Sequence, residues 1–484
     1  MKINSLTLLI SLSITLISTA VVAQDNLKGS WMPDTEQTGD FKQITAFLKS
    51  LGGSFRPMLV SYDGSVVREK AVFNQGKATL HTSEWSCDLK PVKPNRDVLD
   101  LEICFNVDKG ELQSGGIAVA FDFKDWSRDN FVLIPAYVYN GNRFNVETNG
   151  YCSPYPKHYL YNKEVPTQLF ANNPRLALAK NIPGKIEGLT GNASTPAMCF
   201  FSPSKKRAFI LLFEQRSEFG DHGIFVEENA AQNEASFVVS APGVRELRAG
   251  FGDFSPSGDK GTDWKSGDKI NLKFRVYSFK ANSKQDLYER FMDERKALVG
   301  PNHLRNLTPF SKTLELTAVY KNKNRWAELP FGHFYRTGNG DGYLVGWVGG
   351  LMDTYALLAM NDPLSRERVL TTCDFAFGKY QSKSGYFYGP NNEKGEIPTF
   401  EREELPNSSL VRRNADVLFW SIKHFELLKQ QGYGDQIKPE WEKAIHKLAM
   451  AFVNTWKKCG EFGNYVNTET GDVIIYHSAS GAMV

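Results

Sequence analysis

The stretch GYLVGWVGGLMDTYALLAM (Gly342–Met360) decides the fold, because it is apolar on nearly every side. A helix that is apolar all round must be buried on every side. The next stretch, SRERVLTTCDFAFGKY, is amphipathic, and one face carries Val369, Leu370, Cys373 and Phe377. A buried helix followed by an amphipathic one favours a double ring of helical hairpins.

Two more helices are expected after this pair. Leu410–Gln430 has apolar residues at alternating steps of four and three, and the next helix begins at Pro439, a favoured first-turn residue. SASGAMV (Ser478–Val484) looks like the opening of a fifth helix. A helical hairpin cannot bury its own apolar face without neighbours. We therefore expect residues 340–484 to form an incomplete ring, from a chain that is truncated at its C-terminal end.

The preceding part of the chain, from Trp31 to about Lys280, has the pattern of strands. Several runs alternate apolar and polar residues, which is typical of half-buried antiparallel strands. The clearest runs are Asp97–Val107, Gly115–Phe123, Asn130–Asn140, Ala208–Arg216 and Lys269–Phe279. So many strands in one block predict a large β-sandwich.

A linker joins the two blocks. Ser283–Gly300 predicts a helix, because Ser283 and Asp286 form a capping box and Gly300 stops it. An extended segment is expected to follow, up to about Asn339. The fold class is therefore a multidomain α and β protein, with an antiparallel β-sandwich (24–280), a linker helix and extended connector (281–339) and a partial (α/α) toroid (340–484).

The N-terminus has the parts of a secretory signal peptide, over residues 1–23. Lys2 supplies a positive charge, LTLLISLSITLIS is an apolar core, and Val21-Val22-Ala23 is a small-residue cleavage site. The alternative is a single membrane anchor, although the apolar run is near the lower length for spanning. We expect a secreted or periplasmic protein that is not inserted in a membrane after cleavage.

Composition excludes several functional classes. The chain has 57 Lys and Arg against 54 Asp and Glu, a formal net charge of +3, which argues against a nucleic-acid partner. The six cysteines have no metal-binding spacing and are expected to be mostly buried, with their pairing left open. Nucleotide-binding, zinc-protease and hydrolase-elbow motifs are absent from the sequence. We expect neither a metal nor a cofactor.

Three short motifs carry a resemblance to a known family. They are Trp347-Val348-Gly349-Gly350-Leu351-Met352, Arg413-Asn414-Ala415-Asp416 and Ser478-Ala479-Ser480-Gly481-Ala482. With a sandwich and a linker helix before them, the chain resembles the six-hairpin glycosidase superfamily. The resemblance implies an (α/α) toroid, carbohydrate substrates and a site over the mouth of the ring. The superfamily includes hydrolases, phosphorylases and lyases. The chain departs from it by ending before the later hairpins, where one of two acids would often lie.

Glycoside hydrolysis needs two carboxyl groups across the scissile bond. The first candidate is Asp416, which follows Arg413 by three residues, so that both can lie on one helical face. A neighbouring cation holds a carboxylate ionised, which suits a base or a substrate clamp; a structural ion pair is the alternative. The second candidate is Asp341 in GNGDGY, where a turn with a helix cap would explain the same residues.

The connection from Gly378 to Ser409 is long for a link between helices. It carries Tyr386 and Tyr388 and then Glu401, Glu403 and Glu404. One interpretation is a sugar platform beside acids, with Glu403 as a third catalytic candidate. The other is a solvated acidic loop with an aromatic plug packed on the ring.

Two histidines would flank the same mouth, His333 before the first helix and His477 before the fifth. A His or Tyr base, with Arg413 neutralising a uronate, would suit a polysaccharide lyase. Isolated histidines are usually structural. The candidate substrate-binding residues are Trp347, Arg413, Tyr386, Tyr388, His333 and His477.

A third hypothesis concerns the sandwich, where aromatic residues crowd one region. They are Tyr137, Tyr139, Phe144, Tyr151, Tyr155, Tyr159 and Tyr161. They could bind glycans without catalysis, or form a core and a domain interface. The leading hypothesis is an exported glycoside hydrolase acting on a poly- or oligosaccharide through paired carboxylates. A uronate-directed lyase and a non-catalytic glycan-binding protein are the alternatives, and the oligomeric state stays open.

Overall fold

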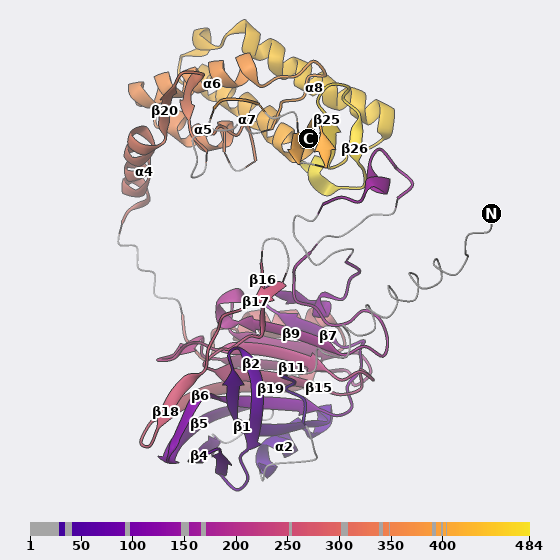
Figure 1. Cartoon of the computed structure of the whole chain (residues 1–484), viewed down its shortest axis with the longest axis vertical. Helices are drawn as coiled ribbons and strands as arrows, with labels where there is room; N and C mark the ends of the chain where they lie inside the picture. Colours follow the sequence, from indigo (N-terminus) through magenta and orange to yellow (C-terminus); the bar gives the residue numbers. More distant parts are fainter. Residues whose placement is uncertain are drawn as a thin grey trace, which may run out of the picture. The chain divides into compact units, whose positions relative to one another are not determined.

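The computed structural model of the 484-residue chain (Figure 1) describes residues 29–33, 41–91, 97–146, 154–165, 171–250, 254–301, 308–337, 342–347, 349–389, 394–397, 400–402 and 404–484. The predicted signal peptide lies outside these residues, as do Tyr151, Cys152, Asp341 and Glu403. The side chain of Glu401 is also outside the description.

The chain divides into two compact units. Met1–Ser153 and Leu169–Asn302 form the first, and Pro154–Gln168 and His303–Val484 form the second. The sequence predicts Pro154–Gln168 within the sandwich, whereas this segment belongs to the second unit, where Tyr155 and Tyr161 contact β25, β26 and the residue before β25, as described below. The predicted domain boundaries otherwise stay predictions.

The first unit is built on two antiparallel sheets. The seven-stranded sheet has the order β2-β1-β6-β15-β14-β9, with β18 also paired to β6. Its strands are β1 (Gly53–Asp63), β2 (Val66–Val72), β6 (Glu111–Phe123), β9 (Gly184–Leu189), β14 (Gly223–Glu228), β15 (Ala235–Ala241) and β18 (Thr262–Lys265). The eight-stranded sheet has the order β3-β4-β5-β19-β11-β10-β7-β8. Its strands are β3 (Lys77–Leu80), β4 (Ser83–Pro91), β5 (Val98–Lys109), β7 (Phe131–Ile134), β8 (Val138–Tyr139), β10 (Ala197–Ser202), β11 (Arg207–Phe213) and β19 (Lys269–Lys280).

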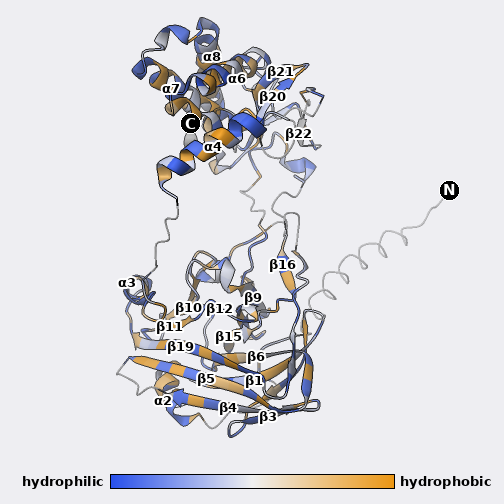
Figure 2. Ribbon diagram, turned by 90° about the vertical axis from the view of Figure 1, so that its left-hand side faces the viewer, coloured by the Kyte–Doolittle hydropathy of each residue, from blue (hydrophilic) through white to orange (hydrophobic). Residues whose placement is uncertain are grey.

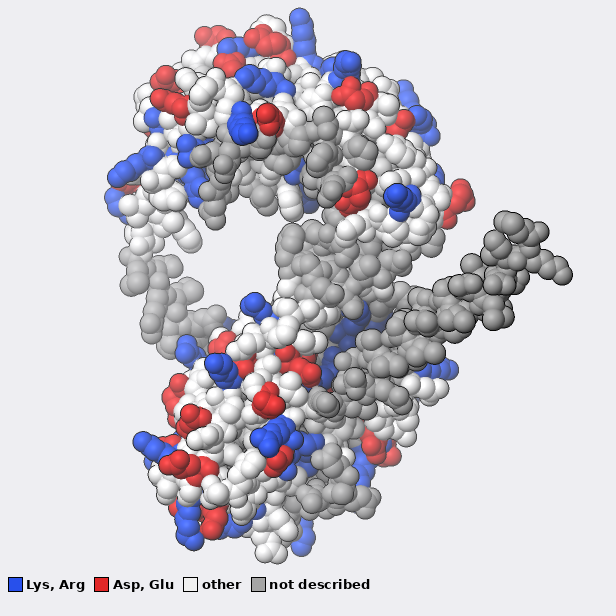
Figure 3. Space-filling view, viewed as in Figure 1, with Lys and Arg blue, Asp and Glu red and all other residues white. Residues whose placement is uncertain are grey.

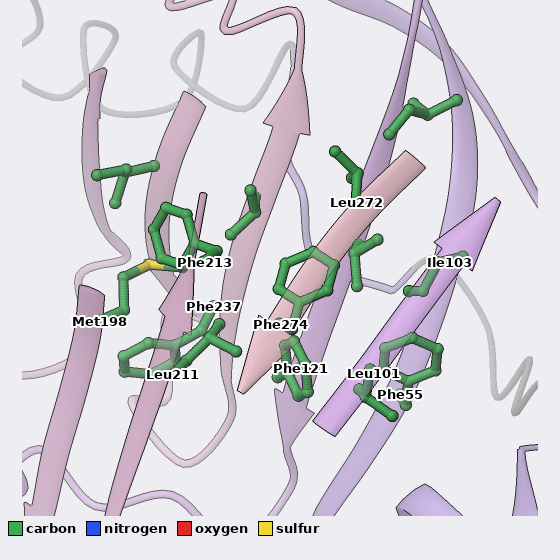
Figure 4. Close-up of a cluster of buried hydrophobic side chains, with 14 of the residues drawn as sticks. Phe55, Leu101, Ile103, Phe121, Met198, Leu211, Phe213, Phe237, Leu272 and Phe274 are labelled. Carbon is green, nitrogen blue, oxygen red and sulfur yellow. The ribbon is translucent and has the colours of Figure 1, made fainter. Parts of the chain in front are cut away.

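The two sheets share one hydrophobic core. Along the first part of β19, residues 269–276, buried residues alternate with more exposed ones, and Figure 2 shows hydrophobic and hydrophilic residues alternating along the strand. In the core, Phe121 of the first sheet lies 6.2 Å from Phe274 and 5.9 Å from Phe209 of the second, measured between ring centroids. Figure 4 shows the side chains of Phe55, Leu101 and Phe121 close together within this core. Two sheets packed face to face are the arrangement that the strand pattern predicts.

The other face of the seven-stranded sheet is also covered. Trp31, which is 1% exposed, packs its ring 4.8 Å from that of Phe225. The backbone around Trp31 is held by side chains of the sheet: Glu227 accepts from its N–H (2.6 Å), and Arg56 donates to its carbonyl (2.8 Å). Polar side chains of β1, β6 and β14 are therefore buried on this face.

The second unit is mainly helical, with short antiparallel strands. Its helices are α4 (Phe310–Asn324), α5 (Leu351–Ala359), α6 (Pro363–Lys379), α7 (Val411–Gln430) and α8 (Pro439–Cys459). The strands form the hairpin of β20 (Trp326–Leu329) and β21 (Gly332–Tyr335), the pair β22 (Phe400–Arg402) and β23 (Leu405–Pro406), and a sheet of β24 (Ser408–Leu410), β25 (Tyr465–Asn467) and β26 (Val473–Ile475). The whole chain is thus a mixed α and β protein with antiparallel sheets.

Three elements of the second unit differ from their predicted form. The helix predicted over Gly342–Met360 begins only at Leu351, because Gly350 has a φ of +58° and ends the regular backbone on its N-terminal side. Helix α4 occupies part of the connector predicted to be extended. The segment predicted to open a fifth helix forms a short 3₁₀ helix, Ala479–Met483, capped by Ser478, and the fifth helix itself stays a prediction.

A helix is present where the sequence predicts the linker helix, but it belongs to the first unit, where Leu287 and Phe291 pack against β10 and β11. It is α3 (Lys284–Glu294), and the Ser283 side chain accepts a hydrogen bond from the Asp286 N–H at its start. Among the described residues, no helix combines the length and apolar character needed to cross a membrane. On the face shown in Figure 3, Lys and Arg side chains are interspersed with Asp and Glu side chains.

Candidate functional site

The first candidate residue, Asp416, lies in the second turn of α7, and α7 packs against α5. Its side chain is only 1% exposed. Two groups contact its carboxylate. The Arg412 Nε lies 3.3 and 3.4 Å from the two oxygens, and the Trp347 backbone N–H donates a hydrogen bond. A carboxylate that is buried with long, partial bonds is costly to keep ionised.

The electrostatics of Asp416 are the reverse of the prediction. Burial raises the pKa of the Asp416 carboxyl, and Arg412 and the Trp347 N–H offset this only in part. The expected pairing with Arg413 is wrong. Arg413 is buried, and its side chain packs beneath Gly346, where an added Cβ would lie 3.2 Å from the Arg413 Cγ. The cation at i−4, Arg412, is the partner, and that spacing was readable from the sequence.

The loop before α5 brings Trp347 to this carboxylate. Trp347 has a φ of +75° and is 39% exposed. A bulky residue in the left-handed region is strained, and such strain is concentrated at functional sites. The loop also needs glycine beside it, since a Cβ on Gly349 would lie 1.9 Å from the Thr337 Cγ2. An exposed aromatic ring therefore belongs to the residue whose backbone contacts the buried acid.

Sequence reasoning overlooked His424, which lies on α7 and faces α5. Its Nε2 lies 3.1 Å from the Thr354 hydroxyl, and its Nδ1 lies 2.7 Å from the Trp420 carbonyl oxygen. Burial lowers the pKa of His424 to about 4, so the ring is neutral at pH 7. The Tyr355 ring packs on it at 5.5 Å. This histidine holds the two helices together, and no sequence motif marks it.

Of the two tyrosines predicted to form a sugar platform, one is buried and the other is partly exposed. Tyr386 is completely buried, its hydroxyl lies 2.6 Å from that of Thr455, and its ring packs on Phe452. Its prediction as a substrate-binding residue is wrong, because its ring forms part of the core. Tyr388 is partly exposed, and its hydroxyl donates to Glu469 at 3.1 Å. Tyr386 therefore matches the alternative prediction, that of an aromatic plug in the core.

Asn414 ties this aromatic loop to α7. Its Oδ1 accepts from the Phe387 N–H (2.7 Å), and its Nδ2 donates to the Ser409 hydroxyl (2.9 Å) and the Leu410 carbonyl (3.1 Å). Every polar atom of this fully buried side chain thus has a partner. The middle of the Arg413–Asp416 motif is structural.

Neither predicted histidine is placed with Asp416 by the described contacts. His333 is exposed on β21, and its ring lies 6.4 Å from that of Trp326. His477 has its Nε2 at 2.7 Å from the Lys163 carbonyl oxygen, and its backbone N–H donates to Glu461 at 2.7 Å. His477 therefore anchors the segment that contains Lys163.

The predicted tyrosine cluster is divided between the two units. In the second unit, Asn464 donates to the Tyr155 hydroxyl (2.7 Å), Asn467 donates to the Tyr161 hydroxyl (3.0 Å), and the Tyr161 N–H donates to the Ile474 carbonyl (2.7 Å). Tyr137 stays in the first unit. The contacts of Tyr155 and Tyr161 secure the segment 154–165 within the second unit.

The remaining acids either lie outside the described residues or have partners in the second unit. Asp341 and Glu403 lie outside the described residues, and the Glu404 Oε1 accepts from the Tyr155 N–H at 3.3 Å. Asp353, which the sequence places in an apolar helix, has Lys321 of α4 as its ionic partner. Within the described residues, no group of three or more His, Cys, Asp or Glu side chains could hold a metal ion, and five cysteines are free thiols.

No protein-family model and no curated protein matches the chain. Among solved structures, the chain is similar to a polysaccharide lyase at 8% identity, covering 82% of this chain and 62% of that one, with a TM-score of 0.32. A protein described as a candidate aldose 1-epimerase from Escherichia coli K12 is 10% identical over 47% of this chain and 66% of that one, with a TM-score of 0.24. A bacterial glucoamylase is 11% identical, covering 89% of this chain and 56% of that one, with a TM-score of 0.19.

These neighbours act on carbohydrates according to their descriptions, but at this identity and TM-score they establish neither a family nor a reaction for this chain. The chain spans between 56% and 66% of the length of these three structures.

Proposed function

We propose that this protein is an exported carbohydrate-active enzyme in which Asp416 acts as a general acid on a poly- or oligosaccharide. The observation that carries the proposal is the buried Asp416 carboxyl, whose pKa is raised by burial and which contacts the backbone of the exposed Trp347. Glycosidases need one carboxyl whose pKa is raised so that it can act as the acid, and burial is the usual way to raise it. The second carboxylate of the proposal is Asp341 or Glu403.

The role of Asp416 changes from the one expected from sequence. A cation beside a carboxylate would have favoured a base, whereas the raised pKa favours an acid. Since the side chain is 1% exposed, the proposal requires the loop that carries Trp347 to move when substrate binds. The Trp347 ring is then in position to stack on a sugar.

We further propose that the second unit is part of an (α/α) toroid. Two helical pairs, α5 with α6 and α7 with α8, provide its hairpins. Support comes from large apolar side chains that stay exposed on α7 and α8: Phe419, Ile422, Met450, Val453 and Trp456. Helices with such faces are typical of arrays in which further helices pack alongside. Export rests on the predicted signal peptide.

The lyase alternative is less well supported. Its base would be a histidine or tyrosine, yet the His477 ring contacts the Lys163 carbonyl and the Glu461 carboxylate, and Glu469 engages the Tyr388 hydroxyl. His333 is exposed on β21, with no described contact to Asp416 or Arg413. A lyase also forms an unsaturated product that absorbs in the ultraviolet, which separates the two reactions in one assay.

The test is the release of reducing sugar from a panel of neutral and uronate polysaccharides by the full-length protein. We expect Asp416→Asn to lower the rate by at least about 100-fold, the usual contribution of a positioned general acid. The matched control is Asp374→Asn, which changes a half-exposed carboxylate on the neighbouring helix α6 and should retain the rate. Full activity of Asp416→Asn would show that Asp416 is only structural.

A further inference from the structure

The first unit contains a cavity of about 390 Å³ at the β9 edge of the seven-stranded sheet. It is bordered by the hairpin of β16 (Leu247–Ala249) and β17 (Phe254–Pro256). Side chains of both charges and two aromatic rings line it, among them Tyr137, Lys185, Glu187, Arg245, Arg248 and Phe254. This volume is within the range of about 300–1,000 Å³ that is typical of small-molecule sites.

Strand alternation explains how β9 supplies charges to the cavity. Ile186 points into the core between the sheets, so its neighbours Lys185 and Glu187 point to the other face. Glu227 of β14, which pairs in register with Lys185, also lines the cavity. Glu227 is only 3% exposed, and Ser30 and the Trp31 N–H donate to its two oxygens, whereas the Lys185 and Glu187 side chains are 23% and 13% exposed. The β9 side chains are the ones presented to a ligand.

These charges are held in place by their neighbours. The Glu187 carboxylate accepts from the backbone N–H groups of Glu246 (2.7 Å) and Leu247 (3.3 Å). The Lys185 Nζ lies 3.3 Å from Glu246 and 4.0 Å from Glu187. Asp259 binds the Arg245 guanidinium at 2.8 and 3.2 Å. A polar site whose groups are already oriented loses little entropy when it binds a ligand.

An aromatic ring completes the site. Tyr137 lies against β9 so closely that a Cβ on Gly188 would be 2.5 Å from its ring, and its hydroxyl donates to the Glu187 carbonyl at 2.8 Å. The ring is therefore fixed in orientation. Gly188 shares the core face of β9 with Ile186, so Tyr137 packs on the core and reaches the cavity at the β9 edge. The fixed carboxylate acceptors and guanidinium donors of the lining match the hydroxyls of a sugar.

The charge balance selects among ligands. The lining contains four cationic side chains and three carboxylates, and Asp259 neutralises one of the cations. An anionic ligand would gain no net attraction, whereas neutral hydroxyls can bond to both kinds of group.

We propose that this cavity is a binding site for a neutral saccharide, separate from Asp416 and independent of catalysis. It goes beyond the proposed enzyme activity, since it would hold a glycan on the sandwich whether or not the helical unit cleaves it. Glu187 accepts sugar hydroxyls, and Arg248 donates to them.

The experiment is calorimetric titration of the full chain with glucose, galactose, mannose and xylose, their β- and α-linked disaccharides, and glucuronate and galacturonate. We expect at least one neutral sugar to bind, with the uronates at least tenfold weaker. Glu187→Gln and Arg248→Ala should each weaken that binding at least tenfold. Arg248 is exposed and has no bonds to lose among those described, so its variant should fold.

Two matched controls separate this proposal from the enzyme proposal. Arg216→Ala removes an exposed arginine outside the cavity, and Asp416→Asn removes the proposed acid; neither should change the affinity. The absence of binding by every sugar in the panel would overturn the proposal. So would equal binding of uronates, or unchanged affinity in both Glu187→Gln and Arg248→Ala. Loss of activity in Asp416→Asn would leave this binding unaffected.

Discussion

Asp122 in the first unit and Asp416 in the second are both buried carboxylates, yet their surroundings differ. Asp122 accepts two hydrogen bonds from Arg56, from Nε at 2.9 Å and from Nη2 at 3.0 Å, and a third from the Ser236 hydroxyl. Among the described residues, Asp416 has the longer contacts to Arg412, whose side chain is 43% exposed, and one backbone N–H. Fully bonded buried charges maintain a fold, whereas partly bonded ones mark sites where chemistry is expected.

The largest expected effect is at the fully bonded pair. Asp122→Asn leaves the Arg56 guanidinium, 3% exposed, without its counter-charge. We expect the free energy of unfolding of the first unit to fall by about 3–5 kcal/mol, the usual cost of breaking a buried pair. Urea unfolding followed by circular dichroism measures it. The control is Asp100→Asn, whose partner Arg275 is partly exposed, and its cost should be about 0–1 kcal/mol. A loss below that of the control would contradict the comparison.

Asn414, two residues before Asp416, should behave like Asp122. Asn414→Ala removes the partners of the Phe387 N–H and the Leu410 carbonyl. We expect the second unit to lose about 2–3 kcal/mol, because buried polar groups left unpaired cost about 1–3 kcal/mol. The control is Asn324→Ala at the exposed end of α4, which should change the free energy of unfolding little. Equal losses in both variants would indicate that Asn414 does not secure the aromatic loop.

Asp416→Asn is expected to change the free energy of unfolding in the opposite direction. The substitution removes a buried charge and keeps an acceptor for the Trp347 N–H, so the second unit should be as stable as the native protein, or more stable by about 1 kcal/mol. Thermal unfolding at pH 7 measures the difference. If Asp416 were a structural ion pair with Arg412, the variant would instead be destabilised, as Asp122→Asn is.

The same comparison predicts a pH dependence. The pKa of folded Asp416 is raised above its usual value of 3.8, so the folded state binds this proton more tightly than the unfolded chain does. Ionised Asp416 therefore destabilises the folded protein at neutral pH, and this cost disappears as pH falls through the raised pKa. The stability difference between Asp416→Asn and the native protein should shrink between pH 7 and pH 4. A difference that is constant across this range would argue against the raised pKa.

The smallest effect is expected at Trp347. Trp347→Gly relieves a left-handed φ, which costs about 1–3 kcal/mol, but gives the unfolded chain more freedom, so the free energy of unfolding should change by less than about 1 kcal/mol. Activity should fall, because the exposed ring is lost. Trp456→Gly, an exposed tryptophan within α8, should instead cost about 1 kcal/mol in helix propensity. Equal destabilisation in the two variants would show that Trp347 is not strained.

Much of the fold was predictable because it depends on residues close in sequence. Alternation along β19 follows from a strand with one face in a core, and Ser283 with Asp286 marks the start of α3. The site was predictable only in part. Asp416 could be singled out by its motif, whereas the choice of Arg412 over Arg413 as its partner depends on the loop that packs over Arg413.

By itself, the sequence determined that a strand-rich part precedes a helical part, the near balance of charge and the position of one candidate acid, since spacing and composition are local properties. Only the tertiary structure decided that Tyr386 is core, that 154–168 joins the helical unit, and that Asp416 is buried with incomplete partners. The physical reason is that burial and hydrogen bonding are set by segments distant in the chain. The shift in the pKa of Asp416 follows from that burial and leaves no trace in the order of the residues.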